Sequence, residues 1–188
     1  MSFDINVHVP GHTWPTARQL DAALVELRFP ARLGDRGADL WESPLAPVPL
    51  EPIITTITDQ QHARLLGVEV GAPYSMPNEM VMPVLLDGDI RDPDFGIQSI
   101  DEPSELAEQM AELGAARPVA VGDRLVWFSH HTDPWNYNAA MYVLVALIRS
   151  FDGFGFELQG MSCGREDFAS ELLDSLYPDP AEAARVYD

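Results

Sequence analysis

The stretch WFSHHTDPWNYNAAMYVLVALI, residues 127–148, decides the fold because it joins a strand to the most apolar helix of the chain. Its second half is apolar on nearly all sides, which predicts a helix buried at the centre of a layer. Asp133 followed by Pro134 is typical of a helix start, with aspartate as the N-cap and proline in the first turn. We therefore expect a buried helix over residues 134–151, preceded by a strand or strand pair within residues 119–129.

The flanking segments add further strands and helices. Residues 3–9 alternate apolar and polar side chains, which predicts a half-buried strand. Thr16 and Gln19 form a capping-box pattern before an apolar helical face, and residues 29–33 read as a returning strand. Asp101 is the expected N-cap of a helix with Leu106, Met110 and Leu113 on its apolar face. After the central helix, residues 154–159 alternate again and residues 165–177 are amphipathic. The sum predicts an α+β protein: a mixed or antiparallel sheet packed with about four to five helices, with two β-α-β-like halves as one arrangement.

The middle of the chain gives a weaker pattern. Residues 41–52 carry too many prolines for a helix or a central strand, and residues 85–94 are an acidic turn region. No flexible linker or low-complexity tract divides the chain. We therefore predict a single domain over residues 1–188, with residues 1–94 and 95–188 as the alternative subdomains.

The charge of the chain excludes some partners. The 188 residues include 30 acidic and 11 basic side chains, for a formal net charge of −19, and every basic side chain is an arginine. Binding to nucleic acid or to anionic membranes needs basic side chains, so neither is expected. An acidic surface instead steers a basic protein partner toward it. The longest apolar run, residues 139–148, is about half of the ~20 residues that span a bilayer.

Compartment is predicted from the cysteine content and the first residues. Cys163 is the single cysteine, which excludes an intrachain disulfide and fits a reducing cytoplasm. The first residues show neither a basic region nor a long apolar run, so no secretory signal is expected. These observations predict a cytoplasmic protein.

Two candidate catalytic groupings compete with structural interpretations. His130 and His131 follow a strand, where adjacent side chains point to opposite faces, so only one of them would pair with Asp133 as a general acid–base. The alternative is that Asp133 caps the helix and the histidines pack. Cys163 at a predicted helix start would favour a thiolate nucleophile, or it is a small buried side chain. Residues 160–164 match G-x-S-x-G, but no histidine follows Ser162 as a hydrolase of that type requires.

Metal and cofactor sites are not predicted. His8 and His12 are four residues apart, but Pro10 and Gly11 lie between them and prevent a helical arrangement. The acidic turn region at residues 87–94 lacks the glycine and glutamate of a calcium loop. We expect no cofactor.

In general character the chain resembles the immunity proteins of bacterial toxin systems. The features that carry this resemblance are the acidic stretch from Asp87 to Glu112, Trp41 with the proline-rich middle, and the near-absence of catalytic groupings. The resemblance implies a non-enzymatic inhibitor that occludes the active site of a basic toxin or effector. The candidate contact residues are Trp41, Glu42, Asp87, Asp89, Asp92 and Asp94. The alternatives are a hydrolase or transferase that uses His130, His131, Asp133 and Cys163, and an accessory subunit of a larger complex.

Overall fold

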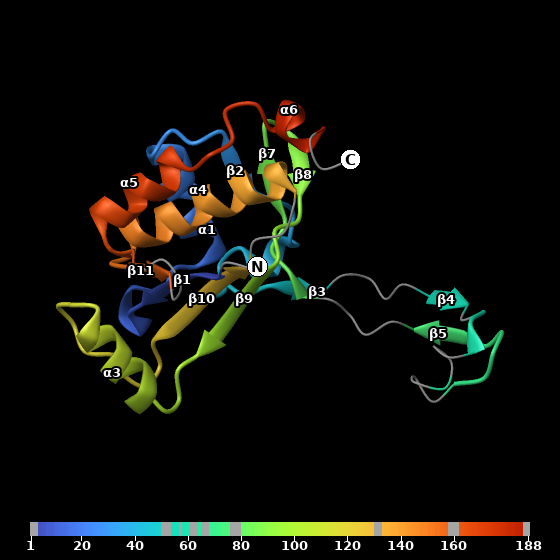
Figure 1. The fold of residues 1–188 in the computed structure, drawn as a ribbon, viewed down its shortest axis with the longest axis horizontal. Helices are drawn as coiled ribbons and strands as arrows, with labels where there is room; N and C mark the ends of the chain where they lie inside the picture. The colour runs from blue at the N-terminus through green and yellow to red at the C-terminus, as the bar shows by residue number, and fades with distance from the viewer. Residues whose placement is uncertain are drawn as a thin grey trace. The chain divides into compact units, whose positions relative to one another are not determined.

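The computed structural model of the chain describes residues 4–49, 54–56, 58–60, 64, 68–75, 80–129, 133–157 and 162–185. In these residues the chain is an α+β protein with five α-helices and antiparallel sheets of five and three strands (Figure 1), which confirms the predicted fold class. The chain divides into two compact units: unit 1 is Met1–Pro47 with Met82–Asp188, and unit 2 is Val48–Val81. The subdomain boundary considered after residue 94 falls inside unit 1.

A five-stranded sheet with β1 at its centre organises unit 1. Its order is β12-β11-β1-β10-β9, and all neighbours are antiparallel. The strands are β1 (Asp4–Val9), β9 (Phe95–Ser99), β10 (Arg124–Ser129), β11 (Phe154–Glu157) and β12 (Cys163–Gly164). Because β10 and β11 are both antiparallel to β1, they run parallel to each other on either side of it. The β-α-β unit around the central helix is therefore split by the first strand of the chain.

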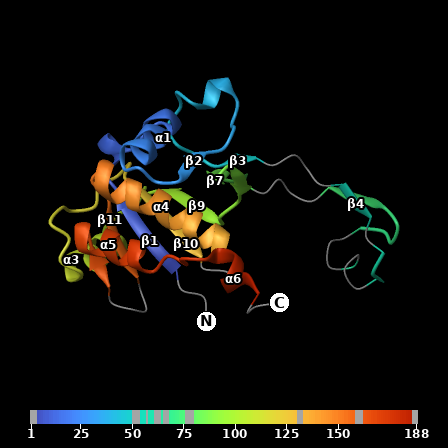
Figure 2. The same cartoon turned by 90° about the horizontal axis from the view of Figure 1, so that it is seen from above.

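Three helices cover one face of this sheet, here called the helix face. They are α1 (Ala17–Glu26), α4 (Pro134–Ser150) and α5 (Glu166–Asp174), and they lie side by side over the sheet (Figure 2). The predicted N-caps are confirmed, because the Asp133 side chain accepts hydrogen bonds from the amides of Trp135 and Asn136. Thr16 and Gln19 form the predicted capping box of α1. Helix α4 is buried along most of its length, as its uniformly apolar sequence predicts.

A fourth helix lies on the opposite face, here called the α3 face. Helix α3 (Ser104–Glu112) follows β9 and leads back to β10. A second, smaller apolar cluster lies here: Ile100, Met110, Val119 and Phe156, with Leu106, Leu113, Leu125 and Cys163 packed against it. The larger cluster lies on the helix face and includes most of α4. The sheet is therefore covered on both faces, but unequally.

The rest of unit 1 extends beyond this sheet. A three-stranded sheet combines β2 (Ala31–Leu33), β7 (Val84–Leu86) and β8 (Asp89–Arg91) in the order β2-β7-β8. Two 3-10 helices, η1 (Gly11–Thr13) and η2 (Ala38–Leu40), and the short helix α6 (Pro180–Ala184) complete the unit. Strands β1 and β2 lie in different sheets. The opening β-α-β sequence therefore does not form a unit within one sheet.

Among its described residues, unit 2 contains two short antiparallel pairs. Strand β3 (Val48–Pro49) pairs with β6 (Met80–Val81), and β4 (Ile54–Thr56) pairs with β5 (Pro73–Ser75). The β-branched residues of β4 form a strand as expected from their propensity.

Candidate functional site

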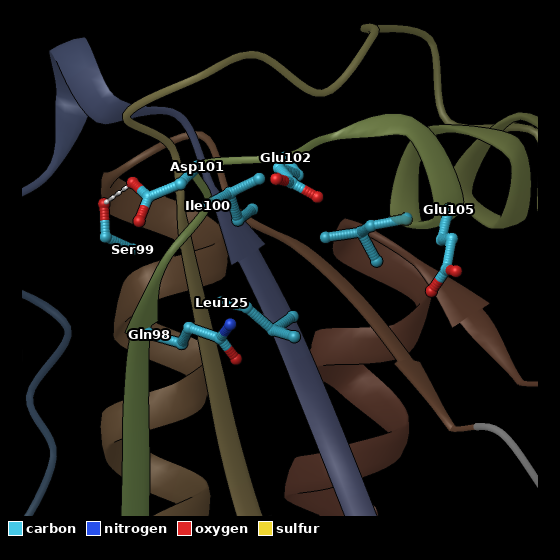
Figure 3. A pocket seen from close by; sticks show the side chains of 8 residues that line it. Gln98, Ser99, Ile100, Asp101, Glu102, Glu105 and Leu125 are labelled. Carbon is cyan, nitrogen blue, oxygen red and sulfur yellow. Dashed lines mark hydrogen bonds between the residues drawn. The ribbon is translucent and has the colours of Figure 1, made fainter.

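An open groove lies where β9 and β10 meet the start of α3. It has a volume of about 480 Å³, and we call it the acidic groove. Its lining residues are Gln98, Ser99, Ile100, Asp101, Glu102, Glu105, Leu106 and Leu125. Figure 3 shows Gln98 and Leu125 on neighbouring strands, with Glu102 and Glu105 at the α3 side. The groove thus combines an apolar floor with a rim of carboxylates.

The connection from β9 to α3 places the carboxylates on the rim. The Ile100 amide donates to the Asp123 carbonyl at 2.9 Å, and the Gly122 amide donates to the Ile100 carbonyl at 2.9 Å. Ile100 is buried by this anchoring, which leaves Asp101 and Glu102 exposed directly after it. We expected Asp101 to cap α3. Instead Pro103 occupies the N-cap position without a side-chain bond, and Asp101 Oδ1 lies 3.5 Å from Ser99 Oγ.

The carboxylates of the groove are not neutralised within the described residues. Asp101, Glu102 and Glu105 are exposed, and none of the ion pairs among the described residues includes them. The Arg124 guanidinium donates from Nη1 to Ser99 Oγ at 2.9 Å and to the Gly122 carbonyl at 2.7 Å. These two bonds connect Arg124 to the end of β9 and to the turn before β10. The groove therefore presents a local excess of negative charge.

A buried histidine–aspartate pair fixes the turn beside the groove. His8 Nε2 donates to Asp123 Oδ2 at 2.9 Å, and each side chain is 3% exposed. The Asp123 carboxylate also accepts from the amides of Gly11 at 2.8 Å and Ala120 at 2.9 Å. Burial alone would raise the pKa of Asp123, but these hydrogen bonds and the charge of His8 outweigh it and hold the pKa below its usual value. The pair joins β1 to the turn that leads into β10.

A second cavity next to His8 is too small for a substrate of ordinary size. Its volume is about 60 Å³, enough for a few water molecules. Arg117 and Arg165 line it, but Arg165 Nη2 lies 2.6 Å from Asp152 Oδ1 and Arg117 Nη1 lies 3.2 Å from His12 Nδ1. Sequence reasoning did not select His8 with Asp123 as a pair, because 115 positions separate them in the chain.

Two of the predicted contact residues lie next to α1. Trp41 follows η2, is partly buried against the main core, and its carbonyl accepts from the Arg18 amide at 2.9 Å. The Glu42 carboxylate forms an exposed ion pair with Arg18. Their role as contact residues stays a prediction.

The four predicted aspartates lie around β8. Asp87 has a positive φ of 53° in the turn between β7 and β8, and Asp89 Oδ2 pairs with Arg91 Nη2 at 3.1 Å. Asp92 and Asp94 are exposed between β8 and β9. None of the four lines the acidic groove, so the groove and these aspartates are separate candidate surfaces.

The predicted catalytic residues are not brought together in the described part of the chain. His130 and His131 lie outside the described residues. Asp133 caps α4. Cys163 is partly buried in β12, where its Sγ lies 3.5 Å from the Leu113 carbonyl and packs against the smaller core. The Ser162 hydroxyl bonds the Glu171 carboxylate rather than a histidine.

Among the described residues, no group of three or more histidine, cysteine, aspartate or glutamate side chains is arranged to hold a metal ion. None of the helices in that part of the chain has the length and apolar character needed to cross a membrane.

No protein-family model matches the chain, and no curated protein or solved structure shows a significant similarity to it.

Proposed function

We propose that this chain is a binding protein for a basic protein partner, and that the acidic groove receives that partner. The observation that supports this most directly is the rim of Asp101, Glu102 and Glu105 around an apolar floor. Interfaces commonly combine a desolvated apolar centre with charged groups at the rim, and complementary charge accelerates association. A partner with a basic, partly apolar surface would supply both the apolar contact and the complementary charge.

The composition of the chain supports the same choice of partner. A net charge of −19 repels acidic surfaces at long range, and it favours encounter with basic ones. The proposal includes a cytoplasmic location, because Cys163 is a free thiol and the single cysteine of the sequence. It also includes the inhibitor role: a protein of this kind that covers the basic active site of a toxin or effector would neutralise it without chemistry of its own.

An enzymatic role has less support in the described residues. The buried His8–Asp123 pair is enclosed by backbone amides and adjoins a cavity of only about 60 Å³. Cys163 has a carbonyl partner and no histidine partner among the described residues. Neither group faces the acidic groove.

The test compares partner capture by two double variants that remove equal charge. Glu102→Gln with Glu105→Gln neutralises the groove, whereas Glu26→Gln with Asp174→Asn neutralises exposed carboxylates on α1 and α5. We expect the wild type and the control variant to capture a stoichiometric basic protein from native lysate, and the groove variant to lose it.

Two results would contradict this function. If both variants capture the partner equally well, the groove is not part of the interface. Salt screens the attraction between surface charges beyond about 10 Å at 0.1 M. If the association rate does not fall between low and moderate ionic strength, charge steering does not drive the association.

A further inference from the structure

Strand β9 is an open edge of the five-stranded sheet. Within the described residues it pairs with β10 alone. The Ile100 amide and carbonyl both bond toward the start of β10. Backbone groups alternate in direction along an antiparallel strand, so those of Gly96 and Gln98 face β10. The N–H and C=O groups of Ile97 and Ser99 therefore point outward.

The far side of the sheet confirms this alternation. The Glu157 amide donates to the Ser162 carbonyl at 2.9 Å, so Glu157 faces β12. The same alternation continues through the residue pairs of β11, β1 and β10. It directs the backbone N–H and C=O groups of Ile97 and Ser99 to the outer side of β9. The hydrogen bonds at Ile100 and at Glu157, on opposite sides of the sheet, therefore give the same direction for these groups.

The edge lacks the usual features that prevent pairing with another chain. Protective edge strands carry charged side chains, proline or a bulge. Strand β9 reads Phe-Gly-Ile-Gln-Ser and contains neither charge nor proline, in a chain whose charged side chains make up 22% of its residues. The Trp127 ring also covers Gly96: a Cβ built on Gly96 would lie 1.8 Å from a ring atom. The ring of Trp127 therefore packs directly on the backbone of β9 at Gly96.

The acidic groove begins at this same edge. Gln98 and Ser99 belong both to β9 and to the groove lining, and the exposed carboxylates of Asp101, Glu102 and Glu105 follow directly (Figure 3). Gln98 pairs with Leu125, and both side chains lie on the α3 face with the groove. In a strand added beside β9, every second side chain would lie on that face, about 7 Å apart.

We infer that the partner contributes an extended basic segment that pairs with the outer edge of β9 as a sixth, antiparallel strand, with its arginine or lysine side chains over the carboxylates of the acidic groove. This mode of binding rests on the proposed function and names the part of the partner that binds. The antiparallel direction follows the other pairs of this sheet. Main-chain hydrogen bonds would supply affinity and the groove would select basic side chains.

The geometry gives a specific requirement for the added strand. Residues that face each other in an antiparallel pair share one face of the sheet. Side chains over the groove must stand opposite Gly96 and Gln98, whose amides face β10. The basic residues of the added strand would therefore direct their own amides away from β9, and the residues between them would bond it.

The test uses a synthetic probe, acetyl-Val-Arg-Val-Arg-Val-Arg-Val-amide, and two N-methylated versions of it, with binding measured by calorimetry on the full chain. N-methylation of two internal valines should weaken binding by at least about tenfold, because it removes amides that bond β9. N-methylation of two arginines should leave the affinity unchanged. The glutamate version of the probe should not bind.

Amide hydrogen exchange provides a second readout. In the free protein the amides of Ile97 and Ser99 should exchange fast, while those of Gly96 and Gln98 are protected by β10. Saturation with the probe should slow exchange at Ile97 and Ser99 by at least about tenfold. No binding of the probe, unchanged exchange at both amides, or equal binding of both N-methylated versions would overturn strand addition.

The outcomes separate this mode of binding from the proposed function. If the groove variant loses its partner from lysate while both N-methylated probes bind equally, the groove binds a basic protein by another mode, and strand addition is wrong. If the valine-methylated probe alone fails but the groove variant keeps its partner, the edge pairs as inferred and the groove is not the partner's site.

Discussion

The two faces of the five-stranded sheet differ, and β1 shows the difference residue by residue. Ile5, Val7 and Val9 belong to the main core under α1, α4 and α5. The alternate positions, Asn6 and His8, point to the α3 face and are buried polar side chains. One strand therefore serves an apolar layer on one side and a polar, partly open layer on the other.

We expect the helix face to determine stability and the α3 face to carry the proposed binding. The helix face is closed by three helices and buries most of α4. The α3 face has one short helix, a small apolar cluster, the His8–Asp123 pair and the acidic groove. We expect changes on the helix face to act on the whole fold, and changes on the α3 face to act locally or on binding.

The largest effect is expected from Leu144→Ala on the helix face. Leu144 is fully buried in α4, so the substitution removes apolar contacts and leaves a cavity. Losses of this kind are about 2–5 kcal/mol, and we expect the upper part of that range because helices pack on both sides. Urea denaturation measures the free energy of unfolding. A loss below about 1 kcal/mol would show that this face does not carry the stability of unit 1.

The next effect is expected from Asp123→Asn on the α3 face. The variant loses the negative charge that pairs with His8. Its side-chain NH2 group also faces one of the two backbone amides that donate to the Asp123 carboxylate. We expect the free energy of unfolding to fall by about 2 kcal/mol. The pKa of Asp123 is lowered in the folded protein from 3.8, so its stabilisation is present above that value and is lost as pH falls through the folded pKa. The stability difference between wild type and variant should therefore shrink in acid. If the stability difference between wild type and variant does not change with pH, the ionised Asp123 carboxylate is not the source of that stability.

An effect of similar size, but confined to one helix, is expected from Met110→Ala in α3. Met110 is 1% exposed, but its neighbours Leu106 and Leu113 are partly exposed and can close over the space. The loss should fall at the lower end of the range, about 2 kcal/mol. Hydrogen exchange should accelerate in α3 and not in α4. Equal acceleration in both helices would show that the two faces unfold together.

The smallest effect is expected from Glu42→Ala. The ion pair between Arg18 and Glu42 is exposed, with side-chain exposures of 63% and 68%. Such pairs contribute little, so stability should change by less than about 1 kcal/mol. In the capture experiment, the same variant should bind the proposed basic partner as well as the wild type does. Loss of the partner would place the binding surface near η2, where the sequence predicted it.

Local features of the fold were predictable from sequence because they depend on neighbouring residues. Asp133 with Pro134, and Thr16 with Gln19, define their helix starts within four positions, and both caps are confirmed. The apolar run after Pro134 predicted the buried helix for the same reason. The fold class followed from the order of these elements.

Features made by distant residues were not predictable in this way. The acidic groove exists because Leu125 lies beside Gln98, and His8 meets Asp123 only once β1 pairs with β10. The acidic stretch in the sequence includes Asp101, Glu102 and Glu105, but the sequence pattern predicts Asp101 as a helix cap. The helix starts later, at Ser104 after Pro103, and this leaves that carboxylate on the groove rim. The roles of His130 and His131 stay predictions.

The central position of β1 has a consequence for the way the chain is made. During synthesis β1 leaves the ribosome well before its neighbours β10 and β11, which begin at Arg124 and Phe154. Until more than a hundred further residues have been added, both edges of this strand lack their native partners. Sheets that depend on such distant pairings fold slowly. We expect truncations that end before β10 to aggregate, and cells to protect the nascent chain through the interval.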